Sequence, residues 1–128
     1  MSMPYSDKAL AVEQRLTALL TGDAWRTASM INGWTGGDPL HYRLSIDKRK
    51  VVLHTTGMTP GTTTNGTQIT TLAAGYRPTS QCVVPCTADV LGTQAPHLTI
   101  HVDGTVYCFG VAGTATYFAC EAEFAIDI

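Results

Sequence analysis

Apolar and polar residues alternate most regularly near the C-terminal end of the chain. One predicted face is apolar and the other polar, because Leu98, Ile100 and Val102 alternate with His97, Thr99, His101 and Asp103. Asp103-Gly104 is a strong hairpin turn signal, and an extended run returns from Thr105 to Phe109. This period of two predicts a β-hairpin. Two more strands are expected, at 115–120 and 123–128.

An earlier part of the chain has the same period. Residues 40–46 alternate well, and a turn at 47–50 leads into the apolar run at 51–56, which predicts a second antiparallel hairpin. Residues 36–39, Gly-Gly-Asp-Pro, form a strong turn cluster just before it. Residues 57–66 are rich in glycine and threonine and are expected to form an exposed loop.

The middle of the chain predicts a strand that stops abruptly. Residues 69–72 favour extended backbone, Gly75 permits a sharp corner, and Pro78 fixes its own φ. A further strand at 82–90 contains Pro85, which favours a sheet edge or a bulge. Short strands separated by turns roughly every 8–12 residues are typical of a sandwich or barrel. The predicted fold class is therefore all-β, an antiparallel jelly-roll-like sandwich over residues 23–128.

Residues 6–21 have the one convincing helical pattern. The apolar side chains of this segment recur in steps of four and three, as in the seam of a coiled coil: Tyr5, Ala9, Val12, Leu16 and Leu19. Isolated helices of this length are marginal in water, so the seam needs a partner. It could join identical subunits in a parallel bundle or lie over an edge of the chain's own sheet. We predict that residues 1–22 form a helix that joins identical subunits; that it is a trimerisation helix is implied by the resemblance given below.

Composition narrows the class of protein. The chain has 128 residues, 45% hydrophobic and 14% charged, and a net charge of −2, which fits one globular domain without membrane insertion. Its few basic residues are dispersed, so a nucleic-acid surface is not expected. No signal peptide is recognised at the start, so synthesis in a cytosol is expected.

Cysteines and histidines give weak signals for metal binding. Four cysteines occur, and buried free thiols are preferred over a disulfide, with a metal site last, because Cys82-x3-Cys86 is a poor zinc signature. His97 and His101 are about 13 Å apart along one strand, too far to share an ion within one chain. Three copies of one histidine could meet at a threefold axis, but solvent or interface positions are preferred for these side chains. No metal or other cofactor is expected.

No catalytic constellation is recognised in the sequence. There is no Gly-x-Ser-x-Gly elbow, and the carboxylates are scattered, although Glu121 and Glu123 share one face of a predicted strand. The prediction is that the protein is not an enzyme, with a polysaccharide hydrolase as the competing hypothesis. Trp25, Tyr42 and Tyr76 are assigned to the core, and Trp34 is left open between core and a sugar-stacking role.

Several segments resemble, in the same order, the C-terminal receptor-binding β-domains of phage tail fibres and minor tail proteins. The segment 68–78, Gln-Ile-Thr-Thr-Leu-Ala-Ala-Gly-Tyr-Arg-Pro, is similar to their TLPAGYRP-type signature, with Ala73 in place of proline. The other matching segments are Trp25, residues 32–35, Tyr42 and Arg43, residues 51–53, residues 57–61 and residues 98–106. Cys82 to Cys86 has no counterpart in that pattern.

The resemblance implies a homotrimer at the tip of a virion tail, made in the host cytoplasm. Its expected partners are other tail or baseplate proteins and a glycan or protein on the host cell surface. Residues 57–66 and 91–97 are the candidate binding loops, while the receptor-binding residues themselves stay unknown. The alternative is a structural baseplate or capsid-decoration protein that binds no receptor.

Overall fold

A computed structural model describes residues 24–45, 47 and 49–126 of the chain. These residues form nine strands: β1 (Arg26–Thr27), β2 (Thr35–Asp38), β3 (His41–Leu44), β4 (Lys50–Thr59), β5 (Thr67–Thr71), β6 (Cys82–Ala88), β7 (His97–Ile100), β8 (Thr105–Phe109) and β9 (Phe118–Ala125). The predicted trimerisation helix and its seam lie outside the described residues. No helix long and apolar enough to cross a membrane occurs in the described part.

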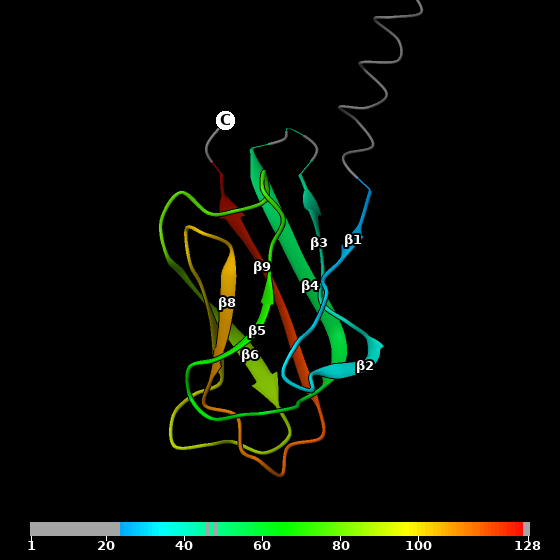
Figure 1. The fold of residues 1–128 in the computed structure, drawn as a ribbon, viewed down its shortest axis with the longest axis vertical. Coiled ribbons are helices and arrows are strands. Elements are labelled where there is room, and N and C mark those ends of the chain that lie inside the picture. Colours follow the sequence, from blue (N-terminus) through cyan, green and yellow to red (C-terminus); the bar gives the residue numbers. More distant parts are fainter. Residues whose placement is uncertain (1–23, 46, 48, 127–128) are drawn as a thin grey trace, which may run out of the picture.

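The strands form one antiparallel sheet that curls on itself (Figure 1), in the order β1-β3-β4-β9-β6-β7-β8-β5, with β2 added beside β4. Strand β6 is the link between the two halves. Its first part, Cys82 to Pro85, pairs with β7, and its second part, Cys86 to Ala88, pairs with β9. Pro85 therefore lies where the strand changes partners, a position that tolerates a residue without a backbone N–H.

The prediction of an all-β antiparallel fold is confirmed. Both predicted hairpins are present, since β3 pairs with β4 and β7 pairs with β8 in antiparallel register. The pairing shows a single curled sheet, a half-barrel, and does not show the separate packed sheets of a jelly-roll-like sandwich.

The core lies inside the curl, where alternate side chains of facing strands meet. In β4 the buried residues are Val51, Leu53, Thr55 and Met58, while the intervening side chains point outward. Leu98 and Ile100 of β7 and Phe118 of β9 are fully buried opposite them. Val102 is an exception to the predicted apolar face, because it lies beyond the end of β7 and is exposed.

The predicted corner after β5 is confirmed and is held by hydrogen bonds. Gly75 has a φ of +91°, which only glycine adopts freely. The Ala73 N–H donates to Tyr42 Oη at 3.1 Å, and Arg77 Nε donates to the Leu72 carbonyl at 3.1 Å. Tyr42 and Tyr76 are buried and pack edge to face, as their assignment to the core predicted.

Two loop predictions need correction. Residues 36–39 were expected to be a turn, but Gly36 belongs to β2, which pairs with β4 through an irregular register. A Cβ on Gly36 would lie 2.9 Å from the Thr59 backbone nitrogen, so glycine permits a strand to approach where the sequence indicated a break. Because β2 pairs with the end of β4, strand β4 continues to Thr59. The loop expected at 57–66 therefore begins only after that residue.

Candidate functional site

The outward side of β1, β3, β4 and β9 carries most of the exposed aromatic and ionisable side chains of this half of the sheet. Strand register places outward side chains in two rows. In the first row His54 lies between His41 and Glu121. In the second row Val52 lies between Arg43 and Glu123. Trp25 adjoins the second row at the edge of the sheet. We call these seven residues the outer face.

Trp25 lies on the outer face, so its assignment to the core was wrong. It is the residue directly before β1, and it is 46% exposed. The physical reason is strand alternation: the next residue, Arg26, places its guanidinium 4.7 Å from the ring centre of the buried Tyr76, so Trp25 points to the opposite side.

The Trp25 indole is held in a defined position. The Arg43 guanidinium lies 4.4 Å from its ring centre in a cation–π contact. The His41 and His54 imidazoles lie 6.4 and 6.2 Å from the indole, centre to centre. These three rings line a hollow of about 270 Å³. The exposed aromatic ring is therefore fixed before any ligand arrives.

A second hollow, of about 320 Å³, adjoins the first at His54 and reaches across β9. His54, Thr56, Thr87, Glu121 and Tyr117 are among the residues that line it. Tyr117 is 43% exposed, and its Oη donates to the Thr56 carbonyl at 2.7 Å. A Cβ on Gly57 would lie 3.2 Å from the Tyr117 ring, so glycine allows this ring to lie close against β4.

Two polar side chains in these hollows have no hydrogen-bond or ion-pair partner among the described residues. Neither the His54 ring nitrogens nor the Glu121 carboxylate makes a hydrogen bond or an ion pair with any described residue. Both groups can therefore bond to a ligand without first breaking a bond within the protein. A site that offers uncommitted hydrogen-bonding groups beside exposed aromatic rings is suited to binding a polar ligand.

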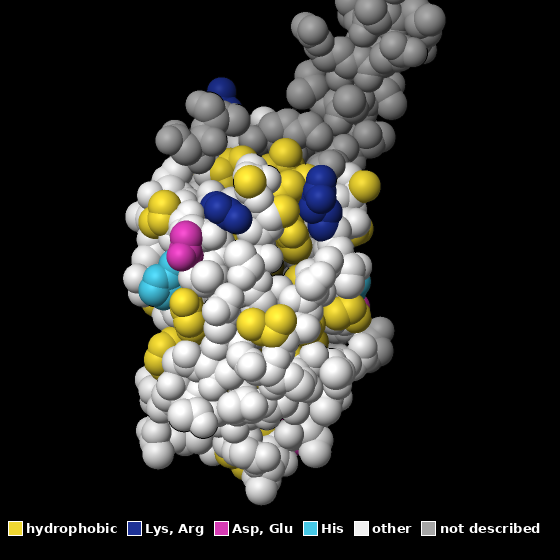
Figure 2. All heavy atoms as spheres, in the orientation of Figure 1, with side chains coloured by type: hydrophobic (Ala, Val, Ile, Leu, Met, Phe, Trp, Pro, Cys, Tyr) yellow, Lys and Arg dark blue, Asp and Glu magenta, His cyan; other side chains and the backbone are white. Residues whose placement is uncertain are grey.

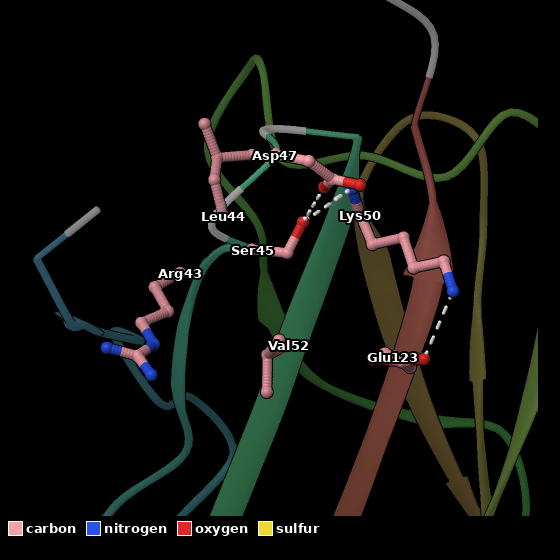
Figure 3. Close-up of a pocket in the computed structure, with 7 residues that line it drawn as sticks. All are labelled: Arg43, Leu44, Ser45, Asp47, Lys50, Val52 and Glu123. Atoms are coloured by element: carbon pink, nitrogen blue, oxygen red, sulfur yellow. Dashed lines mark hydrogen bonds and ion pairs between the residues drawn. The ribbon is translucent and has the colours of Figure 1, made fainter. Parts of the chain in front are cut away.

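The third hollow of this face, about 480 Å³, is formed at the β3–β4 turn (Figure 3). Its charged groups are already paired. Lys50 Nζ lies 3.2 Å from a Glu123 carboxylate oxygen, and Ser45 Oγ donates to Asp47 at 2.6 Å. The Ser45 hydrogen bond lowers the pKa of Asp47. We assign these groups to holding the hairpin rather than to binding.

Asp38 fixes the position of His41 beside the Trp25 ring, which it meets edge to face. Its carboxylate lies 2.7 Å from His41 Nε2 and accepts hydrogen bonds from the Thr56 hydroxyl and, at 2.5 Å, the Thr56 backbone N–H. The hydrogen bonds from Thr56, followed by the one from His41, lower the pKa of Asp38 from 3.8 to about 2. One carboxylate thus joins β2, β3 and β4.

The lowered pKa of Asp38 predicts a loss of stability in acid. Because the folded protein holds this carboxylate ionised, its contribution is complete above the ordinary pKa of 3.8 and is lost as the pH falls towards about 2. Asp38→Asn should lower the free energy of unfolding by about 1–2 kcal/mol at pH 7. Urea unfolding at pH 7 and near pH 2 measures the gap between the two proteins, which should narrow in acid. An equal gap at both pH values would contradict this role of Asp38.

Three loops gather at the end of the molecule opposite residue 24 (Figure 1): residues 60–66, 89–96 and 110–117. The Gly110 N–H donates to Asn65 Oδ1 and the Gly92 N–H to the Gly110 carbonyl, each at 2.9 Å. Asp89 accepts hydrogen bonds from Thr116 and Tyr117, and the Thr116 hydroxyl lowers its pKa. The two predicted loops therefore meet, together with a third that the sequence did not single out.

This loop end is poor in charge. On the face seen in Figure 2, the charged side chains and histidine lie in the upper half, and the lower third is nearly all uncharged. Leu91 is the most exposed large apolar side chain there, at 62%. The loop end and the outer face are thus chemically distinct surfaces.

The remaining candidate residues contribute to packing. Trp34, left open between core and a sugar-stacking role, is buried. In the β7–β8 hairpin, the His97 ring stacks on Phe109 and the His101 ring packs against Tyr107. Of the four cysteines, Cys108 and Cys120 are buried, whereas Cys82 and Cys86 are half-buried. Burial raises the pKa of Cys108 to about 11. Glu121 and Glu123 do share one face, as predicted.

The described part of the chain is thus a curled antiparallel β-domain whose surface carries preformed hollows and fixed aromatic rings. Comparison with solved structures specifies the fold further. The crystal structure of the receptor binding protein (gp15) of Listeria phage PSA superposes with a TM-score of 0.63 at 16% sequence identity, over 95% of this chain and 77% of that one. The resemblance to phage receptor-binding domains is thereby confirmed at the level of the fold. No protein-family model and no curated protein matches the sequence.

Proposed function

We propose that this protein is a non-enzymatic attachment protein of a phage tail, which binds a saccharide or protein on the surface of the host bacterium. The observation that carries the proposal is the fold shared with a phage receptor-binding protein over 95% of the chain. The outer face supports it, because its exposed rings and unpaired polar groups are held ready by neighbouring strands. Such a protein would be made in the host cytoplasm and act at the tail tip, joined to other tail or baseplate proteins.

We further propose that the protein acts as a homotrimer. The support is the apolar seam of the N-terminal segment, whose alternation the sequence shows from Tyr5 to Leu19. The physical advantage is multivalency: three weak sites on one body bind a repetitive surface more tightly than one site can, because the second and third contacts form at high effective concentration.

Leu16→Asp tests both proposals, because it places a charge in the middle of that seam. Sedimentation should show a trimer for the unaltered protein and 13.7 kDa monomers for the variant. Binding of labelled protein to susceptible cells should fall by about 10²-fold with the loss of multivalency. Glu13→Gln, which changes a position outside the seam, should leave both properties unaltered.

The outcomes separate the candidate functions. A monomeric unaltered protein would overturn the trimer. An unaltered protein that decorates virions but ignores every susceptible strain would favour the alternative, a structural baseplate or capsid-decoration protein. Release of reducing ends from host wall material would instead favour a polysaccharide hydrolase.

A further inference from the structure

Two exposed aromatic rings mark the ends of a groove made by the two adjoining hollows of the outer face. Trp25 borders the hollow of about 270 Å³, Tyr117 borders the hollow of about 320 Å³, and His54 lines both. The Trp25 ring lies beside His54, and the Tyr117 ring lies against Gly57, three residues further along β4, so the groove runs along β4 for roughly 10 Å or more. The groove is therefore long enough for a ligand of more than one ring.

Both rings are held in place and are still partly exposed, Trp25 at 46% and Tyr117 at 43%. Arg43 and the two histidines hold the Trp25 indole, and the hydrogen bond to the Thr56 carbonyl holds the Tyr117 ring against Gly57. Fixed rings reduce the ordering cost of binding, because their side-chain rotation is already restricted in the free protein. An aromatic face packs well on the C–H-rich face of a sugar ring.

Polar groups between the rings match a ligand rich in hydroxyls. The His54 imidazole can donate and accept, and the Glu121 carboxylate accepts. Neither is bonded to a described residue, and they are opposite each other in the register of β4 and β9. Thr87 adds a hydroxyl at the far side of the second hollow. Hydroxyl groups of a ligand would thus meet both donors and acceptors.

The charge of the groove disfavours other ligands. Among the described residues that line the two hollows, none is Lys or Arg, and Glu121 is the one carboxylate. It has no ion-pair partner among the described residues. A phosphate-rich polymer would therefore meet a negative charge without a compensating cation in the hollows. A protein partner needs a surface of roughly 800 Å² with an apolar centre, whereas the ionisable side chains of His54 and Glu121 lie in the middle of this groove.

We propose that the Trp25–Tyr117 groove binds an uncharged oligosaccharide, with the Trp25 and Tyr117 rings stacking on two different sugar units and His54 and Glu121 hydrogen-bonding to the hydroxyls between them. This inference rests on the proposed attachment function and names the ligand class and the residues that bind it. Each hollow holds one sugar unit, so a single unit contacts one ring and a longer chain contacts both.

Calorimetric titration of the full chain with neutral hexoses and N-acetylhexosamines, and with their di- to tetrasaccharides, tests the groove. Binding should strengthen from one unit to two or three. Trp25→Ala and Tyr117→Ala should each weaken oligosaccharide binding by about tenfold or more. Tyr117→Phe keeps the ring and should retain most of the affinity. Val102→Ala, an exposed apolar side chain on the β7–β8 turn, is the matched control and should change nothing.

Fluorescence gives a second measurement that depends on Trp25 directly. The chain has two tryptophans, Trp25 exposed and Trp34 buried, so bound sugar should shift the emission of the unaltered protein and not that of Trp25→Phe. Circular dichroism of each variant shows whether it is folded.

Every outcome bears on the groove. No binding of any sugar of the panel at 10 mM, roughly the weak end of specific affinities, would overturn it. So would equal affinity of Trp25→Ala and the unaltered protein, or tighter binding of glycerol phosphate polymer than of neutral sugar. A change in sedimentation of Trp25→Ala would show that this face joins copies of the chain, and would also overturn it. Cell binding that survives Trp25→Ala would refute the groove alone and leave the attachment function standing.

Discussion

Trp34→Ala is expected to lower the free energy of unfolding by about 3–5 kcal/mol, the usual cost of removing a large buried aromatic side chain. Trp34 is only 2% exposed, and its ring packs edge to face on Phe118 at 5.1 Å between centres. Its Nε1 also donates to the Thr62 carbonyl at 2.9 Å. The substitution would leave a cavity and remove the stronger of this carbonyl's two donors, the other being the Cys108 thiol at 3.9 Å. The free energy of unfolding of a whole domain is about 5–15 kcal/mol, so this loss is a large part of the total stability.

The chain supplies a matched control, because the same substitution at the exposed Trp25 removes an equally large side chain. Trp25→Ala should cost about 1 kcal/mol or less, mainly through the lost cation–π contact with Arg43. Urea unfolding followed by circular dichroism gives both values. Similar losses at the two positions would contradict the burial pattern. If Trp34→Ala does not fold, Trp34→Phe should still show a loss greater than that of Trp25→Ala.

Gly61→Ala is expected to destabilise the protein by about 3 kcal/mol or more, near the upper end for overpacking. A Cβ on Gly61 would lie 2.3 Å from the Asn32 carbonyl oxygen, 2.3 Å from the Gly33 carbonyl carbon and 2.6 Å from the Trp34 nitrogen. All three are backbone atoms, so no side-chain rotation relieves the clash. The Thr62 N–H also donates to Asn32 at 2.9 Å, and the alanine would strain this bond.

Gly113→Ala is the control for this substitution. A Cβ there would make only an ordinary contact, 3.7 Å from Thr63 Oγ1, and the change in stability should stay within about 0.5 kcal/mol. Thermal unfolding of the two variants measures the difference. A Gly61→Ala protein as stable as Gly113→Ala would show that the segments around Asn32 and Gly61 do not pack as closely as described.

The hairpins could be predicted because their information is local. Alternation and a turn signal within about twenty residues determine β3–β4 and β7–β8, and the corner at Gly75 follows from glycine and proline in the same short segment. The curl of the sheet could not be predicted in this way. It depends on β6 pairing with β9, whose paired residues are thirty or more positions away.

The two tryptophans show why burial was harder to predict than strands. Both precede short strands in similar surroundings, and the sequence favoured the core for Trp25 and left Trp34 open. Distant partners decide the outcome: Phe118 and Thr62 enclose Trp34, whereas Arg26 covers Tyr76 and turns Trp25 outward. The sequence shows only that adjacent side chains of a strand point to opposite sides of the sheet. It does not show which side is buried.

The candidate site was missed for the same reason. Its groups come from the start of the described chain, from β4 and from β9, and His54 meets Glu121 only through the pairing of strands far apart in sequence. Tyr117 gave one weak signal, as an aromatic residue at the start of an alternating run. Nothing in the local pattern distinguishes it from the many strand aromatics that fill cores.

The shared strand β6 has a mechanical consequence. Since its two parts pair with different neighbours, the two halves of the sheet are joined through one continuous stretch of chain, Cys82 to Ala88. Because the two ladders are adjacent on this stretch, we expect a tensile load between the two ends of the domain to break them together, and a single rupture event in a pulling experiment is the corresponding signature. A particle anchored to a cell in flowing liquid would gain from a domain that yields all at once or not at all.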